Sequence, residues 1–494
     1  MDLLPQALYS AAQTRELDRR AIEDHGVAGD ELMRRAGLAG FCALRLLWPR
    51  ARSITVVCGP GNNGGDGYVL AGAASQAGLA VRVLADDAPR SVVARAARAA
   101  METAGVTVAA LGTGVAGADV VVDAIFGTGL EREVRGPWRE QFGRINECAA
   151  PVLALDIPSG LHADTGAVMG GAVRACATLS FIGLNLGLFT GAGREHAGRI
   201  VYADLDLPPT LAAAMEPAAM RLRADVALAA MGARPRDAHK GLAGRVLVVG
   251  GERGMCGAAR MAAESAARAG AGLVTVATRS AHAGFLNAGR PELMVRGVES
   301  PVALRDLMEA ADVVAVGPGL GRGEWGRQAF GAALALSTSL VVDADALYHL
   351  AQEPERRADW VLTPHPGEAA RLLGCEAAEV QADRPAAAGA IAERYGGVCV
   401  LKGCGTLITG AGALALCDRG NPGMASGGTG DVLTGVIAGL RAQGLSARDA
   451  ACSGVWLHAS AGDRAAGEGE IGTLATDLLP WIRAGRNGVD PCRD

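Results

Sequence analysis

Short runs of β-branched and apolar residues recur along the first half of the chain, separated by stretches rich in Ala and Arg. The runs are Ile54–Val57, Val81–Leu84, Val120–Val122 and Val152–Leu155, and the intervening stretch Ser91–Thr103 favours a helix. This alternation is typical of βαβ units, in which a mainly parallel sheet carries helices on both faces. The first half is therefore predicted to form a Rossmann-like three-layer α/β/α domain.

The second half repeats the alternation. Its alanine-rich run Ala258–Ala269 predicts a helix. Its strand-like runs are Val246–Val249, Leu273–Ala277, Val313–Val316, Leu340–Val342, Val361–Leu362 and Val398–Leu401. A second α/β domain is predicted.

Strand-like patterning is lost between residues 208 and 240. Pro208, Pro209, Pro217 and the segment Arg234–Lys240 favour a linker there. The predicted organisation is a first domain at residues 1–215, a linker at 216–240, a second domain at 241–485 and a tail at 486–494.

Composition excludes several classes of protein. Of 494 residues, 50% are hydrophobic and 20% are charged, which argues against disorder. The net charge of −5 implies no general attraction to nucleic acid or to an acidic membrane. Eleven cysteines without paired spacing indicate a reducing compartment, and no signal peptide or apolar stretch of membrane-spanning length is found. A cytoplasmic enzyme without nucleic-acid or membrane partners is expected.

The segment Asn421–Asp431 is the most informative stretch for chemistry. Gly427, Gly428 and Gly430 precede an apolar, helix-compatible run, so backbone N–H groups and a helix N-terminus can face a phosphate. Asp431 would repel that phosphate, which suggests that it takes a proton from an attacking hydroxyl. The simpler alternative is that Asp431 only caps the helix.

Four other motifs precede this segment. They are Gly317–Gly321, Val341–Leu347, Thr363–Glu368 and Leu401–Ile408. With the glycine segment they resemble the ribokinase-like superfamily, and more narrowly the domain that dehydrates hydrated NADH and NADPH. The resemblance covers residues from about Gly244 to Pro480.

This resemblance implies roles for individual residues. The donor would be ADP with Mg²⁺. Independently of the resemblance, Asp343 and Asp345 follow the run Leu340–Val342 and could either help to hold Mg²⁺ or cap a helix, and both alternatives stay open. The substrate would contact Ala258, Gly319, His365 and Asp431, and the nucleotide phosphates would contact Lys402, Gly403, Cys404, Gly405, Thr406 and Gly430.

The first half carries its own glycine-rich segment, Gly59–Gly67, between a predicted strand and a helix expected over Tyr68–Gln76. Unlike the usual dinucleotide fingerprint, it contains Asn62, Asn63 and Asp66. The two amides can bind a ligand or merely tolerate a left-handed turn, and Asp66 can bind a ligand or cap the helix.

Two further acids follow predicted strands. Asp123 ends the run Val120–Val122, and Asp156 ends the run Val152–Leu155. Ligands of open α/β sheets bind at the carboxyl ends of the strands, so both acids are expected over one pocket.

Residues from about Ala11 to Asp206 resemble the NAD(P)H-hydrate epimerase family. The matching motifs are Asn62–Asp66, Asp123–Gly129 and Leu155–Gly160. The resemblance implies a K⁺ ion held by Asn63, Asp123 and Ser159. It implies substrate contacts with Asn62, Asn63, Gly64, Gly65, Asp66, Gly127, Thr128, Gly129, Leu130, Glu131, Arg132, Glu133 and Asp156. Asp156 and Asp123 are the candidate catalytic acids, without a choice between them.

The two resemblances together predict a bifunctional repair enzyme. It would epimerise the R and S hydrates of NADH and NADPH (NADHX and NADPHX) and dehydrate the S form with ADP, releasing AMP and phosphate. The family forms homo-oligomers, so one is expected here. The alternatives are an ordinary kinase of a vitamin precursor or sugar joined to a binding module, and a non-catalytic nucleotide sensor.

Overall fold

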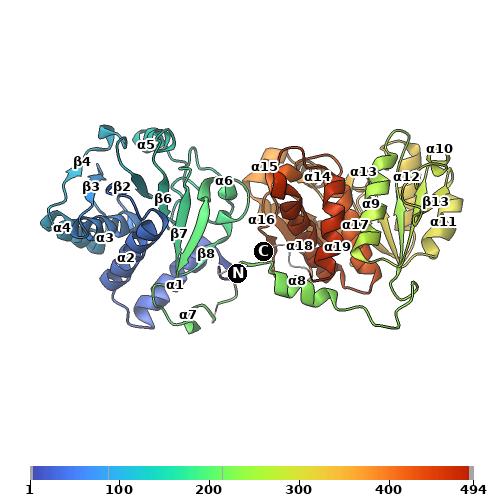
Figure 1. Ribbon diagram of the computed structural model, residues 1–494, viewed down its shortest axis with the longest axis horizontal. Helices are drawn as coiled ribbons and strands as arrows, with labels where there is room; N and C mark the ends of the chain where they lie inside the picture. Colours follow the sequence, from blue (N-terminus) through green and yellow to red (C-terminus); the bar gives the residue numbers. More distant parts are fainter. Residues whose placement is uncertain (1–3, 87, 214, 489–494) are drawn as a thin grey trace. The chain divides into compact units, whose positions relative to one another are not determined.

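The computed structural model describes residues 4–86, 88–213 and 215–488. It divides the chain into two compact units, one of residues 2–220 and one of residues 221–494 (Figure 1). Residues 489–494 of the predicted tail lie outside the described residues.

The first unit is built on a parallel sheet with the strand order β4-β3-β2-β5-β6-β7-β9. Its strands are β2 (Ser53–Cys58), β3 (Ala80–Leu84), β4 (Val108–Ala109), β5 (Val120–Ala124), β6 (Val152–Leu155), β7 (Ala177–Phe181) and β9 (Arg199–Ala203). From β2 the chain moves through β3 to β4 at one edge, and β5 then starts the other direction. The order therefore reverses between β2 and β5, where α/β sheets form a ligand crevice at the carboxyl ends of their strands.

Helices cover both faces of this sheet. On one face Val56 and Val122 pack with the side chains of α3 and neighbouring helices, whereas on the other Val57 and Val121 pack against Phe142 of α5. The helices are α1 (Ala11–Glu23), α2 (Gly29–Leu47), α3 (Asn62–Gln76), α4 (Val92–Thr103), α5 (Pro137–Asn146), α6 (Gly193–Ala197) and α7 (Thr210–Ala213). Short strands β1 (Ala7–Tyr9), β8 (Leu184–Asn185) and β10 (Ala219–Arg221) complete the ordered elements up to the division between the units.

The sheet of the second unit has the order β13-β12-β11-β14-β15-β16-β17-β18-β19. It is parallel through β17 and antiparallel from β17 to β19. The strands are β11 (Arg245–Val249), β12 (Leu273–Thr278), β13 (Met294–Gly297), β14 (Val313–Val316), β15 (Ser339–Val342), β16 (Trp360–Leu362), β17 (Val398–Leu401), β18 (Thr406–Thr409) and β19 (Ala415–Cys417). All the predicted strands are present, and the predicted α/β fold class is confirmed for both halves.

The helices of the second unit are α8 (Ala224–Met231), α9 (Cys256–Ala269), α10 (Ser280–Ala283), α11 (Pro301–Glu309), α12 (Glu324–Leu334), α13 (Ala344–Gln352), α14 (Pro366–Leu373), α15 (Ala377–Ala382), α16 (Arg384–Tyr395), α17 (Thr429–Ala442), α18 (Ala447–Ala465) and α19 (Leu478–Arg486). Helix α17 lies directly on α9. A Cβ on Gly435 would overlap the carbonyl oxygen of Ala262, and one on Gly439 would come within 2.6 Å of that of Ala266. Glycine at these positions lets the backbones approach, which fixes the helix that carries Asp431.

The predicted linker 216–240 contains ordered structure. Helix α8 packs in the core of the second unit through Ala227 and Met231, and Ser453 Oγ of α18 donates a hydrogen bond to the Ala227 carbonyl (3.1 Å). The Leu222 N–H donates to the Leu416 carbonyl (2.8 Å). Residues 221–233 are thus part of the second unit.

We expect fragments cut at this division to fold and act separately. Fragment 1–220 should keep the epimerase activity that its resemblance implies, and fragment 221–494 should keep the implied dehydration of one epimer, because each retains its own sheet and core. A fragment beginning at Arg234 should unfold at a lower temperature than fragment 221–494, because it lacks the buried face of α8. Thermal unfolding and both activities measure this; an inactive, unfolded 221–494 fragment would contradict the division.

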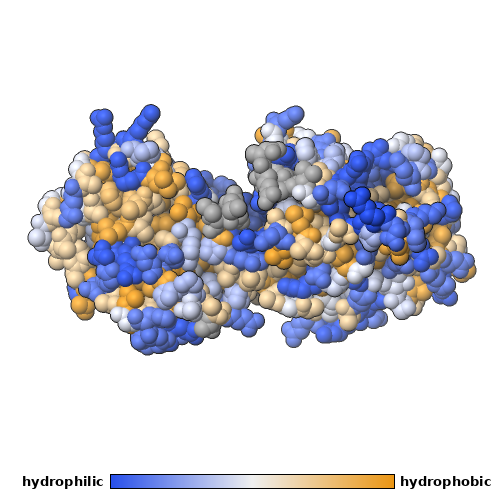
Figure 2. Space-filling view, turned by 60° about the horizontal axis from the view of Figure 1, so that its bottom comes forward, coloured by the Kyte–Doolittle hydropathy of each residue, from blue (hydrophilic) through white to orange (hydrophobic). Residues whose placement is uncertain are grey.

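No helix among the described residues is long and apolar enough to cross a membrane. On the face drawn in Figure 2, hydrophilic residues lie among apolar ones over both units.

Candidate active sites

A cavity of about 790 Å³ lies in the first unit at the carboxyl ends of β2, β5 and β6. Residues of α1, α2 and the segment after β5 also line it. Of the predicted substrate residues, those that line it are Asn62, Asn63, Asp66, Gly127, Thr128, Gly129, Leu130, Glu131, Arg132, Glu133 and Asp156. The structure therefore brings three predicted motifs to one place.

The predicted asparagine loop is the first turn of a helix. Helix α3 begins at Asn62, six residues before the expected start, and its N-cap is Gly61, so Asp66 is not the cap. Gly64 and Gly65 do not line the cavity. A Cβ on Gly64 would overlap the Gly59 carbonyl, and one on Gly65 would come within 2.5 Å of Met33 Sδ. These two glycines allow close packing of α3, which overrides the poor helix propensity of the segment.

The two asparagines have different surroundings. Asn62 Oδ1 accepts a hydrogen bond from Ser91 Oγ (2.7 Å). Asn63 is 8% exposed, and neither its Oδ1 nor its Nδ2 has a hydrogen-bond partner among the described residues. An unpaired buried amide is costly unless a ligand or ion completes it. The unpaired Asn63 amide is therefore consistent with the predicted contact to a ligand or ion, which stays a prediction.

Asp123 and Ser159 form a buried pair beneath the cavity rather than on its lining. Asp123 Oδ1 accepts from Ser159 Oγ (2.6 Å), and Oδ2 accepts from the Ser159 N–H (2.8 Å). Burial raises the pKa of Asp123 to about 6, against the lowering effect of these hydrogen bonds. No group of three or more His, Cys, Asp or Glu residues suited to a metal is found in the described part of the chain. A K⁺ site here would have to rest on amide, hydroxyl and backbone oxygens beside one carboxylate.

Asp156 holds an unusual backbone position at the end of β6. Its φ of 67° is left-handed, a conformation uncommon for residues other than glycine. Its Oδ2 accepts a hydrogen bond from the Thr128 N–H (2.8 Å), and a Cβ on Gly127 would overlap the same oxygen. Burial raises the pKa of Asp156, partly offset by the Thr128 N–H. The loop from β5 thus holds this carboxyl at the cavity.

Asp18 of α1 also lines the cavity and was absent from the sequence prediction. Burial, and then the charge of Asp156, raise the pKa of Asp18 to about 7. The pKa of Asp66 is raised well above its ordinary value by burial, then by Asp156 and Asp18. Because Asp18 is close in sequence to the charged residues Glu16 and Arg19, the sequence favours a solvated helix face there. It gives no sign that Asp18 lines a cavity.

In the second unit, the N-terminus of α17 presents unpaired backbone donors. Gly428, the N-cap, is left-handed (φ 97°), and α17 begins at Thr429. The N–H groups of Thr429, Gly430 and Asp431 donate to no acceptor among the described residues. With the positive end of the helix dipole, they have the arrangement that an anion site needs, and anion binding at this segment stays a prediction.

Asp431 lies in the first turn of α17 but does not cap it. The N-cap residue is Gly428, and no described side chain donates to or accepts from the cap position. Burial raises the pKa of Asp431 to about 7, followed by the charge of Asp343, while Lys402 lowers it. A carboxyl with a pKa near neutrality suits a general base.

Lys402 directly follows β17 and contacts α17 through Asp343. Its Nζ lies 2.7 Å from Asp343 Oδ1 and 3.7 Å from Glu368 Oε2, and Thr434 Oγ1 donates to Asp343 Oδ2 (2.7 Å). A Cβ on Gly430 would lie 3.3 Å from Lys402 Nζ. Burial lowers the pKa of Lys402, but Asp343 and Glu368 outweigh it and the net shift is upward. The ammonium is therefore charged beside the first turn of α17.

The predicted nucleotide segment 402–406 is held from behind by Arg384. This buried guanidinium donates through Nη2 to the carbonyls of Leu401, Lys402 and Gly405 (3.3 to 3.4 Å). Gly403 (φ 134°) passes so close that a Cβ would lie 3.0 Å from Arg384 Nη1. Sequence reasoning missed Arg384, since a charged residue opening a helix is usually solvated.

His458 of α18 is a second residue that the sequence did not indicate. Its Nε2 lies 2.9 Å from the Thr429 carbonyl, and burial lowers its pKa to about 4. A neutral His458 thus supports the first turn of α17 next to Asp431.

His365 has a structural contact of its own. Its Nδ1 accepts from the N–H groups of Gly367 (3.0 Å) and Glu368 (3.4 Å), which caps α14. Its ring is more than half exposed, and Nε2 lies 3.4 Å from Glu368 Oε1. The cap fixes the ring beside the Lys402 cluster, and a substrate contact remains a prediction.

Ala258 and Gly319 are neighbours. Gly319 is left-handed (φ 59°), and a Cβ there would lie 3.2 Å from Ala258 Cβ and 2.5 Å from the Met255 carbonyl. The loop that contains Gly319 is held by α13, where Asp345 Oδ2 accepts from the Gly321 N–H (3.0 Å). This contact favours a structural role for Asp345 over magnesium binding.

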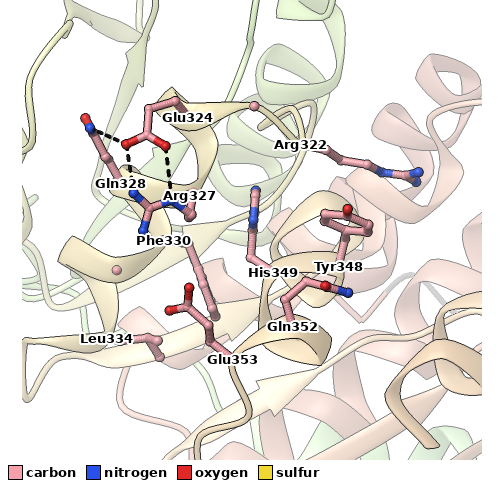
Figure 3. Close-up of a pocket in the computed structure, with 12 residues that line it drawn as sticks. Arg322, Glu324, Arg327, Gln328, Phe330, Leu334, Tyr348, His349, Gln352 and Glu353 are labelled. Carbon is pink, nitrogen blue, oxygen red and sulfur yellow. Dashed lines mark hydrogen bonds and ion pairs between the residues drawn. The ribbon is translucent and has the colours of Figure 1, made fainter. Parts of the chain in front are cut away.

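A further cavity of about 430 Å³ lies between α12 and α13, and Arg322 and Gly323 of the same loop line part of it. Figure 3 shows Glu324 bonded to Arg327 and Gln328, with Tyr348 and His349 side by side. His349 Nε2 lies 3.0 Å from the Gly321 carbonyl. None of the predicted site residues lines this cavity. Its contacts support the loop.

Comparison with known proteins matches both halves. A family model described as NAD(P)H-hydrate dehydratase matches residues 246–483, and one described as YjeF-related protein N-terminus matches residues 29–187. A solved ribokinase-like superfamily protein from Enterococcus faecalis is 33% identical, with a TM-score of 0.52 over 56% of this chain and 98% of its own. The ribokinase-like fold predicted for the second half is confirmed.

Two curated relatives span almost the whole chain. The bifunctional NAD(P)H-hydrate repair enzyme of Coxiella burnetii is 47% identical over 481 residues, 96% of this chain and 98% of that protein. The enzyme of the same name from Escherichia coli is 44% identical over 485 residues, 97% and 94% of the two chains. The predicted fusion of an epimerase and a dehydratase half is confirmed, and the chain belongs to the family of bifunctional NAD(P)H-hydrate repair enzymes.

Proposed function

We propose that the cavity of the first unit interconverts the R and S hydrates of NADH and NADPH. We propose that the site between α17 and Lys402 dehydrates the S form with ADP, releasing AMP and phosphate. The observation that carries the second assignment is a carboxyl with a pKa near 7, Asp431, beside three unpaired N–H groups and an ammonium. That set combines a base with stabilisation of a transferring phosphoryl group.

The dehydration follows from the placement of these groups. Asp431 takes the proton of the substrate hydroxyl, and the hydroxyl oxygen attacks the terminal phosphorus of ADP. The bond from that phosphorus to the bridging oxygen breaks, and AMP leaves with the bonding electron pair. The N–H groups of Thr429, Gly430 and Asp431, with Lys402, stabilise the negative charge that develops on the phosphoryl oxygens. Phosphate then leaves the ring carbon as the ring nitrogen donates its electron pair, which restores the double bond after a proton is lost.

Mg²⁺ bound with ADP supplies positive charge to the phosphates, and Asp343 is the carboxylate here suited to help hold it. Its oxygens are directed at Lys402 and Thr434, both next to the N-terminus of α17. Arg384 keeps the segment 402–406 in the shape that approaches the nucleotide.

For the first unit we propose that K⁺ is held by Asn63, Asp123 and Ser159. The unpaired Asn63 amide supports this assignment, because it lacks the partner that a cation would provide to its oxygen. K⁺ bound there supplies positive charge beside Asp123 and the carboxyls of the cavity. The substrate would contact the lining residues, and Asp156 would move the proton.

Placing both activities on one chain has a chemical reason. Phosphoryl transfer requires in-line placement of one hydroxyl, so the second site accepts one epimer and the first converts the other into it. We further propose a cytoplasmic homo-oligomer.

Product analysis tests this function. With hydrated NADH, ADP and Mg²⁺, we expect the absorbance of reduced nicotinamide and free phosphate to rise in equal amounts. Turnover should be faster with ADP than with ATP at equal concentration. A stable phosphorylated product would instead favour an ordinary kinase, and a clear preference for ATP would overturn the donor assignment.

A further inference from the structure

Three aspartates line the cavity of the first unit, and they come from three separate elements. Asp18 is on α1, Asp66 on α3, and Asp156 follows β6 (Figure 1). The same lining includes Asn63, a residue that is 8% exposed and whose buried amide has no hydrogen-bond partner among the described residues. That unpaired amide is an independent sign that the carboxyls face a ligand.

Asp18 has no structural partner. Its carboxyl makes no hydrogen bond or ion pair among the described residues, although Glu16 on the same helix pairs with Arg19 and Arg20 at 2.8 Å. Burial, followed by repulsion from Asp156, disfavours its charged form and raises its pKa. A carboxyl that weakens the fold in this way, inside a cavity, indicates a functional role.

We propose that Asp18 is a catalytic residue of epimerisation and acts with Asp156 as an acid/base pair on the carbon that carries the hydroxyl. This inference rests on the proposed function of the first unit. An inversion needs proton transfer on both faces of the ring, and two carboxyls from different walls of one cavity can provide it.

The step balances with these two groups alone. The protonated carboxyl of one residue gives its proton to the hydroxyl, the C–O bond breaks, and water leaves with the bonding pair as the ring nitrogen forms a C=N bond. Water then adds to the opposite face, the C=N pair returns to nitrogen, and the carboxylate of the other residue takes the proton. One proton has passed from one carboxyl to the other, and no oxidant or reductant is needed.

The test supplies the full-length enzyme with the R hydrate, ADP and Mg²⁺, and separately with the S hydrate. Asp18→Asn should lower consumption of the R hydrate by ~10²–10⁴-fold, as expected for loss of a positioned acid or base, and leave consumption of the S hydrate unchanged. Asp24→Asn is the matched control, because this substitution removes an exposed carboxyl just after the same helix. The Asp24→Asn enzyme should consume both hydrates at wild-type rates.

Two further measurements separate catalysis from folding. The first unit of Asp18→Asn should unfold at the same temperature as the wild type or higher, because a repelling carboxyl is removed. The double variant Asp18→Asn/Asp156→Asn should be no slower than the slower single variant, since the pair acts as a unit. R-hydrate turnover at the wild-type rate in Asp18→Asn, or loss of activity accompanied by a lower unfolding temperature, would overturn the inference. Absence of R-hydrate turnover in the wild type would instead overturn the proposed function.

Discussion

Replacing Asp431 with Asn is expected to lower dehydration of the S hydrate by ~10²–10⁴-fold while ADP affinity changes little. Asn has the same shape but no carboxylate to accept the hydroxyl proton. The alternative role as a helix cap predicts the opposite, because Asn caps as well as Asp. The structure already places Gly428 at the N-cap. Measuring both the turnover rate and the affinity for ADP distinguishes the general-base role from the helix-cap role. Near-wild-type turnover would end the catalytic assignment, and lost ADP binding would indicate a structural role.

Asp449→Asn provides the matched control for this substitution. Asp449 lies in the first turn of α18, as Asp431 does in α17, but it is exposed and bonded to its own N-cap Ser446 (2.6 Å). Dehydration by this variant should equal that of the wild type. The wild-type rate should also fall as the pH is lowered through about 7, because protonated Asp431 cannot act as a base.

Much of the fold was predictable because it depends on local patterns. The β-branched runs such as Val120–Val122 lie buried in parallel strands, where nearly continuous apolar sequence is expected. Asp123 lies near the end of one such strand and Asp156 directly follows another, so their position near the carboxyl edge of the sheet was predictable from the same pattern. Only their depth differed: Asp156 lines the cavity, whereas Asp123 lies beneath it.

The predicted start of α3 was wrong by six residues, because tertiary packing outweighs the local preferences of this segment. Asn62–Gly67 contains residues that favour turns, and their local preferences predict a loop. The helix nevertheless begins at Asn62, because its glycines fit against Gly59, Met33 and Ala124. These contacts join segments that are distant in sequence, so local sequence preferences do not predict them.

Residues that act through long-range contacts were also missed. Asp18, Arg384 and His458 sit on ordinary helices, where a charged residue is normally solvated. Their roles appear only when α1, α16 and α18 are placed against the segments they contact. The pairing of Lys402 with Asp343 across 59 positions has the same origin.

For the first unit, Asp156 gives a cleaner test than Asp123. Asp123→Ala should abolish epimerisation, but it would also leave the N–H groups of Ser159 and Ile125 without their carboxylate acceptor in the core, at a cost of about 1–3 kcal/mol each. Loss of activity in that variant would mix catalysis with stability. At position 156 Asn tolerates the left-handed backbone and can still accept the Thr128 N–H.

Asp156→Asn should therefore lower R-to-S interconversion by ~10²–10⁴-fold, while dehydration of the S hydrate continues at the wild-type rate. The second activity of the same chain reports that the protein is folded. Asp206→Asn is the control, since Asp206 is also left-handed (φ 55°) but exposed and outside the cavity lining, and it should interconvert the epimers normally. Epimerisation at the wild-type rate in Asp156→Asn would remove this carboxyl from the chemistry. Proton transfer would then have to be sought among Asp18, Asp66 and Asp123.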